Sequence, residues 1–203
     1  MGAEVSTATE VERKPLRADA QRNYDKIVET ARAMFRERGA DASLDEIAKR
    51  AGVGPGTLYR HFPTRDALMA EVFRRNVDEL CDGAEQLLAE LPPDEALCEW
   101  MQRFVRYVAV KKGLATHLKS VISADSELFT YSHGRVTGTF ESLLKAATDA
   151  GTIRSDVAAD DLLHALSGIC MVSEGDTQQQ GCRMSRLLVD GLRYRPEAAA
   201  ATG

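Results

Sequence analysis

Two short helices are predicted between Ser43 and Pro63, because capping, glycine and proline residues mark their ends. This pattern constrains the fold more than any other feature of the chain. Ser43 and Glu46 have the S-x-x-E spacing of a capping box, in which each side chain satisfies a backbone N–H of the other residue. A helix is therefore expected to begin after Ser43. Gly52 is placed to end it, because glycine readily adopts the left-handed conformation that follows many helices.

The second helix of the pair follows after a short turn. Pro55 is tolerated at a first helical position, where a backbone N–H would have no helical partner in any case. Pro63 disfavours helical geometry in the residue before it, so this helix can reach only as far as Phe62. The segment is thus a helix, a turn of about three residues and a helix of about two turns, which is the helix-turn-helix pattern.

A longer amphipathic helix precedes the pair and supplies the surface on which it packs. Its apolar residues recur at three- and four-residue steps up to a stop at Gly39; they are Tyr24, Ile27, Val28, Ala31, Met34 and Phe35. Leu58 and Phe62 lie four positions apart on the last helix, so both are predicted to face this surface as core residues.

The rest of the chain is also predicted to be helical. Apolar periodicity and proline or glycine stops place helices from Arg65 to Pro92, from Asp94 past Val108, around Leu114 to Val121, and at about 126–150, 159–173 and 178–192. The fold class expected from the sequence is therefore all-α.

The composition is that of an ordinary soluble globular chain, since 44% of its 203 residues are hydrophobic and 28% are charged. No apolar run approaches the length of a membrane span, and the amino terminus lacks the apolar region of a secretory signal, so a cytoplasmic location is expected. The four cysteines lie far apart without a C-x-x-C motif or clustered histidines. We therefore expect reduced thiols, no metal site and no cofactor.

The net charge of −5 is unevenly distributed along the chain. Residues 1–75 carry 14 Lys and Arg against 12 Asp and Glu, whereas residues 76–203 carry 12 against 19. Only the first part has a basic bias, and that bias is small. A nucleic-acid partner has to be argued from where the charges lie rather than from their number.

Two other interpretations of the segment are a phosphate-binding loop and a catalytic pair. A phosphate loop requires a preceding strand and a G-x-G-x-x-G or G-x-x-x-x-G-K spacing, and the segment has neither. Tyr59 and His61 are two positions apart, so they point to different sides of a helix, and the sequence places no nucleophile or carboxylate beside them. No nucleophile elbow, metal-ligand spacing or cofactor fingerprint occurs elsewhere, so an enzyme is not expected.

The stretch LDEIAKRAGVGPGTLYRHFPTRDAL resembles the amino-terminal DNA-binding domain of the tetracycline-repressor (TetR) family of bacterial transcriptional regulators. The resemblance runs from about Arg22 into the helix that follows Pro63. It departs from the family pattern at Gly54, where Ser or Ala is common, and at Arg65, where Lys is usual. The resemblance implies a double-stranded DNA operator, a small-molecule effector and a homodimer as partners, but it identifies no ligand beyond about Glu90.

The predicted DNA-binding residues lie on and beside the second helix of the pair; they are Ser43, Pro55, Gly56, Thr57, Tyr59, Arg60, His61 and Arg65. Pro55 and Gly56 lack long side chains, so the helix amino terminus can approach DNA closely. Thr57 offers a hydroxyl and a methyl group to a base edge, whereas Tyr59 and His61 can donate to phosphates. The resemblance places Arg65 near a phosphate. For each residue alone, an ordinary solvated surface position remains the alternative.

The basic residues before the first helix, Arg13, Lys14, Arg17 and Arg22, have two open interpretations. They can follow the DNA backbone or enter a minor groove. A solubilising tail explains them equally well.

A ligand site is predicted among the middle helices, where aromatic and polarizable side chains with polar tips resemble the lining of small-molecule cavities. The residues are Trp100, Met101, Phe104, Tyr107, His117, Tyr131, His133 and Met171. Gly134 and Gly138 are expected to loosen the helix that carries Tyr131. Ordinary core packing is the alternative for the aromatic residues, and a structural or surface role for each histidine.

A dimer interface is predicted on the last two helices, whose apolar faces would form a four-helix bundle with a second copy. Its residues are Leu162, Leu166, Ile169, Met184, Leu187 and Leu188. The alternative is that both faces are buried within one subunit.

Together these features predict four segments: a disordered arm at 1–18, a helix-turn-helix DNA-binding domain at 19–64, a helical effector-binding and dimerisation domain at 65–195, and a flexible tail at 196–203. The predicted function is a ligand-responsive transcriptional repressor that binds a palindromic operator as a dimer and is released by a small molecule. A DNA-binding protein of the same fold without an effector is the alternative.

Overall fold

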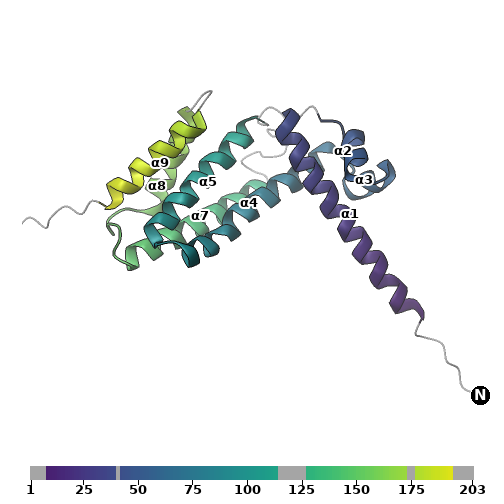
Figure 1. Ribbon diagram of the computed structural model, residues 1–203, viewed down its shortest axis with the longest axis horizontal. Coiled ribbons are helices and arrows are strands. Elements are labelled where there is room, and N and C mark those ends of the chain that lie inside the picture. Colours follow the sequence, from purple (N-terminus) through teal and green to yellow (C-terminus); the bar gives the residue numbers. More distant parts are fainter. Residues whose placement is uncertain (1–7, 40–41, 114–126, 173–176, 194–203) are drawn as a thin grey trace, which may run out of the picture. The chain divides into compact units, whose positions relative to one another are not determined.

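The computed structural model describes residues 8–39, 42–113, 127–172 and 177–193, and every regular element within these ranges is a helix (Figure 1). In chain order they are α1 (Ala8–Arg38), α2 (Leu44–Ala51), α3 (Pro55–His61), α4 (Arg65–Glu90), α5 (Pro93–Gly113), α7 (Glu127–Asp149), α8 (Ala159–Val172) and α9 (Thr177–Arg193). The all-α prediction is confirmed for this part of the chain. The helix predicted at 114–121 and the tail predicted at 196–203 lie outside the described residues.

The chain divides into two compact units, residues 1–73 and residues 74–203. The division falls within α4, after Phe73, whereas the sequence placed the domain boundary before Arg65. α4 therefore contributes residues to both units.

In the first unit, α2 and α3 both pack on α1. The predicted core is confirmed, because Ile27, Val28, Leu58 and Phe62 are all at most 3% exposed. α1 begins at Ala8, so residues 8–18 are helical where the sequence predicted a disordered arm. That prediction rested on the lack of apolar periodicity and on Pro15, which is unfavourable inside a helix. Ala, Glu, Arg and Lys, which have high intrinsic helix propensity, surround that proline.

The ends of α2 follow from local chemistry. The Glu46 N–H donates to Ser43 Oγ over 3.1 Å, and the Ser43 N–H donates to the Glu46 carboxylate over 3.3 Å, which confirms the capping box. Gly52 ends the helix with φ +70°, in the left-handed region that favours glycine. α3 then begins at Pro55 and ends at His61, two residues before Pro63.

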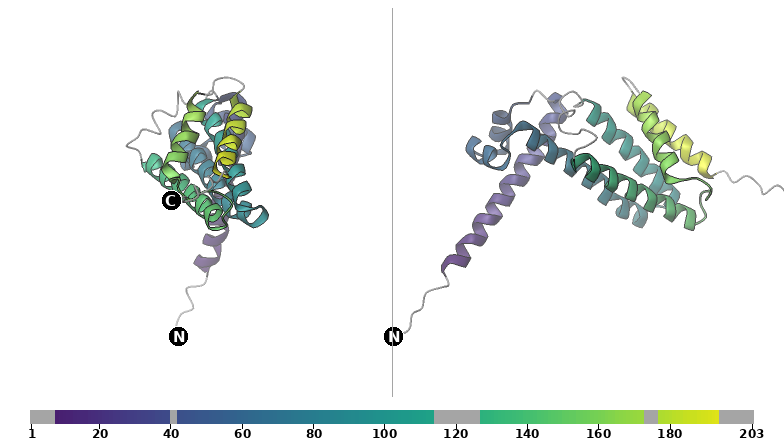
Figure 2. Two further views of the ribbon diagram at one scale, coloured as in Figure 1. Left: turned by 90° about the vertical axis from the view of Figure 1, so that its left-hand side faces the viewer. Right: turned by 180° about the vertical axis from the view of Figure 1, so that it is seen from behind.

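In the second unit, α5 contacts α7, α8 and α9, and α8 and α9 run side by side along it (Figures 1 and 2). Trp100 is completely buried, and its Nε1–H donates to the Leu80 carbonyl over 3.0 Å. Its ring lies 5.8 Å from that of Phe104 and 5.7 Å from that of Phe140, measured between centroids. This aromatic cluster forms the core between α5 and α7.

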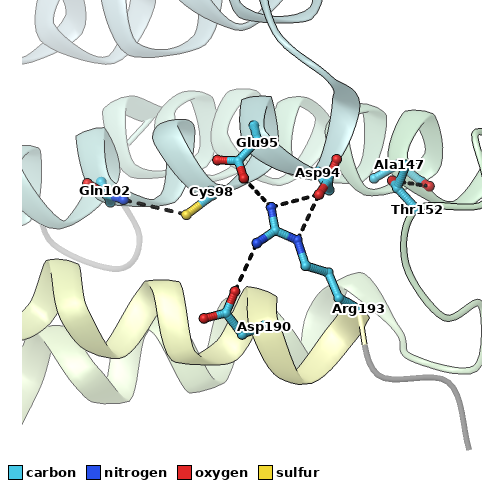
Figure 3. Close-up of polar contacts among 8 residues, drawn as sticks. All are labelled: Asp94, Glu95, Cys98, Gln102, Ala147, Thr152, Asp190 and Arg193. Carbon is cyan, nitrogen blue, oxygen red and sulfur yellow. Dashed lines mark hydrogen bonds and ion pairs between the residues drawn. The ribbon is translucent and has the colours of Figure 1, made fainter.

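Two features hold α9 against α5. A Cβ at Gly181 would lie 2.7 Å from Val105 Cγ1, so the absence of a side chain permits the close approach of the helices. At the other end of α9, Arg193 is surrounded by three carboxylates (Figure 3). Its Nε donates to Asp94 over 2.7 Å, and its two terminal nitrogens donate to Glu95 and Asp190.

Candidate nucleic-acid interface

The outward side of α3 carries most of the side chains predicted to contact DNA. Pro55, Gly56 and Arg60 are exposed, Tyr59 is 44% exposed, and Thr57 is half-buried. Because Leu58 points into the core of the first unit, its neighbours in the helix are left at the surface. The helix thus presents small groups at its start, followed by a hydroxyl, a phenol and a guanidinium.

His61 lies differently from these residues. Its ring packs edge-on against Tyr24 of α1, with the centroids 5.8 Å apart, and it also lies beside Phe62. Its Nε2 is buried and has no hydrogen-bond partner among the described residues. The structure places the ring of His61 in the packing between α1 and α3, which leaves its predicted phosphate contact without geometric support.

Arg65 and Ser43 are also engaged within the first unit. Arg65 Nη2 donates to the Ala42 carbonyl over 2.5 Å, and the guanidinium lies over the Phe35 ring, 5.9 Å from its centroid. The Ser43 side chain is exposed, but its oxygen accepts the cap hydrogen bond of α2. Arg65 is thus half-buried and already bonded within the unit, whereas Ser43 stays at the surface.

An ion pair joins α1 and α2, and no motif in the sequence indicates it. Arg50 of α2 donates to both carboxylate oxygens of Glu37, over 2.6 and 2.9 Å. The hydrogen bond from Arg50 lowers the pKa of Glu37, and the bond to Glu37 raises the pKa of Arg50. The two residues are 13 positions apart, so no helical spacing could reveal the pair. The ion pair makes Arg50 a link between helices, although its side chain stays exposed, as does that of Lys49 beside it.

The predicted ligand residues fall into two groups. Trp100, Met101 and Phe104 are buried in the aromatic cluster, and Tyr107 joins it with its ring 6.2 Å from that of Phe104. Burial is the main cause that raises the pKa of Tyr107, and the nearby Cys81 thiol raises it further. These four residues of α5 therefore lie together in an apolar environment.

The remaining ligand residues do not join that cluster. His133 stacks on Phe129 at the exposed side of α7, with the centroids 5.9 Å apart. Tyr131 is 37% exposed and donates its hydroxyl to Asp78 of α4, which raises the pKa of Tyr131. Met171 is 72% exposed, and His117 lies outside the described residues. The structure therefore brings together only part of the predicted site.

The residues predicted to form a dimer interface differ in their solvent exposure. Leu162 and Leu166 are buried within the chain because α8 packs against α5, α7 and α9, so the structure corrects their assignment to an outward face. Ile169 and Leu188 are half-buried. Met184 is 38% exposed and Leu187 is 69% exposed, so α9 keeps an outward apolar surface.

The described residues also lack two other kinds of site. None of the helices there is long and apolar enough to cross a membrane. The same ranges contain no group of His, Cys, Asp and Glu side chains able to hold a metal ion.

Two family models match successive parts of the chain, in the same order as the two predicted domains. Residues 27–72 match the model described as bacterial regulatory proteins of the tetR family. Residues 92–194 match the model described as the C-terminal domain of SbtR-like transcriptional regulators.

Comparison with individual proteins gives both partial and nearly complete matches. An HTH-type transcriptional regulator of Staphylococcus aureus is 42% identical over 64 residues, which is 31% of this chain and 35% of that protein. The chain thus spans about a third of the length of that curated relative.

Two solved structures match much more of the chain. A TetR transcriptional regulator from Streptomyces coelicolor is 44% identical, with 86% of this chain and 99% of that one covered and a TM-score of 0.73. A TetR transcription regulatory protein from Mycobacterium vanbaalenii is 37% identical, with coverages of 89% and 100% and a TM-score of 0.69.

Proposed function

Because this chain belongs to the TetR family of bacterial transcriptional regulators, we propose that it binds a palindromic operator as a homodimer, represses transcription there and is released by a small molecule. The observation that carries the proposal is the outward side of α3, where Thr57, Tyr59 and Arg60 stand beside two residues without long side chains. This set suits a helix that lies against a groove of DNA.

The roles on α3 are divided by chemistry. Thr57 contacts a base edge through its hydroxyl and methyl groups. Tyr59 donates its hydroxyl to a phosphate, and the Arg60 guanidinium neutralises a phosphate charge. Pro55 and Gly56 allow the backbone at the start of α3 to approach the DNA closely.

The dimer is proposed to form through α9, with α8 beside it. Met184 and Leu187 are exposed apolar residues one turn apart, and a second copy related by a two-fold axis would cover them. A single reading helix buries little protein surface on DNA, so two linked copies are needed for tight binding.

Ligand release is proposed to act through the α5–α7 region. A ligand held near Phe104 and Tyr107 would favour a conformation in which the two reading helices are wrongly spaced for successive major grooves. A coupling free energy of about 1–3 kcal/mol would weaken operator binding about 5- to 150-fold.

A second candidate function is a regulator without an effector. Its support is the packing of Trp100 and Met101, which are completely buried, with the Trp100 N–H already bonded to the Leu80 carbonyl. A ligand at this position would have to displace well-packed core side chains.

Selection of bound duplexes from a random DNA pool tests the operator proposal. We expect two inverted copies of one half-site, with centres about 10–10.5 base pairs or a multiple of that apart. Enrichment of a single unrepeated half-site would contradict dimeric binding, and enrichment of no sequence would contradict specific recognition.

A thermal-shift screen of small molecules separates the two candidate functions. A compound that raises the melting temperature and weakens operator affinity supports ligand release. If no compound in a chemically diverse library does either, the regulator without an effector is favoured.

A further inference from the structure

Arg65 is the first residue of α4, and three features of the first unit surround its guanidinium. One terminal nitrogen donates to the Ala42 carbonyl over 2.5 Å. The guanidinium carbon lies 5.9 Å from the centroid of the Phe35 ring of α1. The Nε atom is buried without a hydrogen-bond partner among the described residues. The side chain is therefore directed into the protein.

The contact joins the two ends of the helix-turn-helix. Ala42 directly precedes Ser43, the residue that caps α2, and Arg65 follows α3 by four positions. Arg65 and Ala42 are 23 positions apart, and the chain between them contains all of α2, the turn and α3. A bond between these two residues closes that segment into a ring, and Phe35 ties the ring to α1.

Local helix energetics do not explain a positive charge at this position. The amino terminus of a helix carries a partial positive charge, so a basic residue there is unfavourable unless another group compensates it. The start of α4 is already capped, because the Ala67 N–H donates to Thr64 Oγ1 over 3.1 Å. The compensation for Arg65 comes from the Ala42 carbonyl and the face of the Phe35 ring.

We propose that Arg65 is a positioning residue for DNA reading: its guanidinium holds both ends of the helix-turn-helix together and thereby fixes the orientation of α3, instead of binding a phosphate. This inference rests on the proposed role of α3 in reading DNA.

The planar guanidinium suits this role better than the lysine ammonium. It can lie flat over an aromatic ring and donate within its own plane at the same time. An ammonium is a compact and strongly hydrated charge, so Arg65→Lys keeps the charge but loses the flat contact with Phe35. Arg65→Lys therefore separates positioning from charge neutralisation.

Amide hydrogen exchange of the protein without DNA is the first test. In Arg65→Ala and in Arg65→Lys, we expect exchange at Thr57 and Leu58, whose N–H groups bond to the Gly54 carbonyl, to become about tenfold faster. Exchange at Ile27 in α1 should stay unchanged, which distinguishes a loosened helix-turn-helix from a general loss of stability. Unchanged exchange at Thr57 and Leu58 in both variants would overturn the proposal.

DNA binding is the second test, with Arg60→Ala as the matched control. For both Arg65 variants, the ratio of operator affinity to random-duplex affinity should fall about tenfold, while the slope of log affinity against log salt on random duplex stays unchanged. Arg60→Ala should flatten that slope by about one unit per subunit and leave exchange unchanged.

If Arg65→Lys behaves like the wild type while Arg65→Ala flattens the salt slope, Arg65 is a phosphate contact and the proposal is overturned. If Arg65→Ala does not fold, the amide exchange and the DNA affinities of Arg65→Lys alone test the proposal. The exchange test needs no operator, so a failure of the proposed DNA reading is distinguishable from a failure of the positioning role.

Discussion

At the scale of single residues, Gly52 and Gly54 lie in the same turn but have different backbone conformations. Gly52 has φ +70°, a conformation that side-chain-bearing residues rarely adopt, whereas Gly54 has φ −68° and an extended ψ. A Cβ added at either position meets no atom within 4 Å. The two glycines therefore differ in backbone strain alone.

This difference predicts unequal effects of alanine. Gly52→Ala should lower the free energy of unfolding by about 1 kcal/mol, because Ala is strained at positive φ. Gly54→Ala should leave it unchanged or slightly raised, since Ala fits that backbone and restricts the unfolded chain. Urea unfolding of the two variants measures both values, and equal effects would contradict the assignment.

Substitutions in α3 should weaken DNA binding in different ways. Thr57→Ala should cost about 1–3 kcal/mol of binding free energy on the operator alone, because it would remove the proposed base contact. Arg60→Ala should weaken binding to operator and random duplex alike and flatten the salt slope, because it would remove the proposed phosphate contact. Salt titrations on both duplexes measure this.

Leu58→Ala serves as the control, since Leu58 is completely buried. It should lower the melting temperature and impair binding only through the fold. A Thr57→Ala variant that weakens both duplexes equally would show that the roles are wrongly divided.

At the scale of helices, the sequence predicted the elements whose ends have local causes. Ser43 with Glu46, Gly52, and Pro63 act through neighbours only a few positions away, and the structure has α2 and α3 where these residues placed them. The side on which an apolar helix packs has no such local cause. Periodicity gave α8 and α9 apolar faces, but it could not distinguish Leu166, buried within the chain, from Leu187, which is exposed.

The same limit applies to the candidate sites. Residue type suggested that Trp100 and Tyr131 share a site, yet the first lies in the core and the second bonds to Asp78 at the surface. Arg65 matched a basic position of a family motif, and its contacts with Ala42 and Phe35 depend on residues more than 20 positions away. Such contacts require the tertiary fold.

The Arg193 cluster predicts how the end of α9 is held. Arg193→Gln should lower the free energy of unfolding by about 1–2 kcal/mol, because it leaves Asp94, whose side chain is only 13% exposed, without its charged partner. Lys145→Ala is the control, since it breaks a pair with Asp149 in which both side chains are more than half exposed, and it should change stability by less than about 0.5 kcal/mol. Thermal and urea unfolding measure the free energy of unfolding of both variants. If both lose a similar amount of stability, the low solvent exposure of the Arg193–Asp94 pair is not the cause of its effect.

For the molecule as a whole, the proposed operator binding depends on self-association. Leu187→Glu should convert the proposed dimer to a folded monomer, because a carboxylate would be buried in its apolar interface. Leu91→Glu, at an apolar residue that is 37% exposed outside α8 and α9, should leave the dimer intact. Sedimentation equilibrium with circular dichroism measures mass and folding together, and a dimeric Leu187→Glu protein would place the interface elsewhere.

The proposed function requires that this protein recognise one DNA sequence through paired α3 helices. The most direct measurement is the affinity of the wild-type protein for its selected operator and for a scrambled duplex of equal length, at several salt concentrations. We expect one dimer per operator and an affinity at physiological salt at least about 10³-fold higher for the operator than for the scrambled duplex. Equal affinity for the two duplexes would contradict the proposed function.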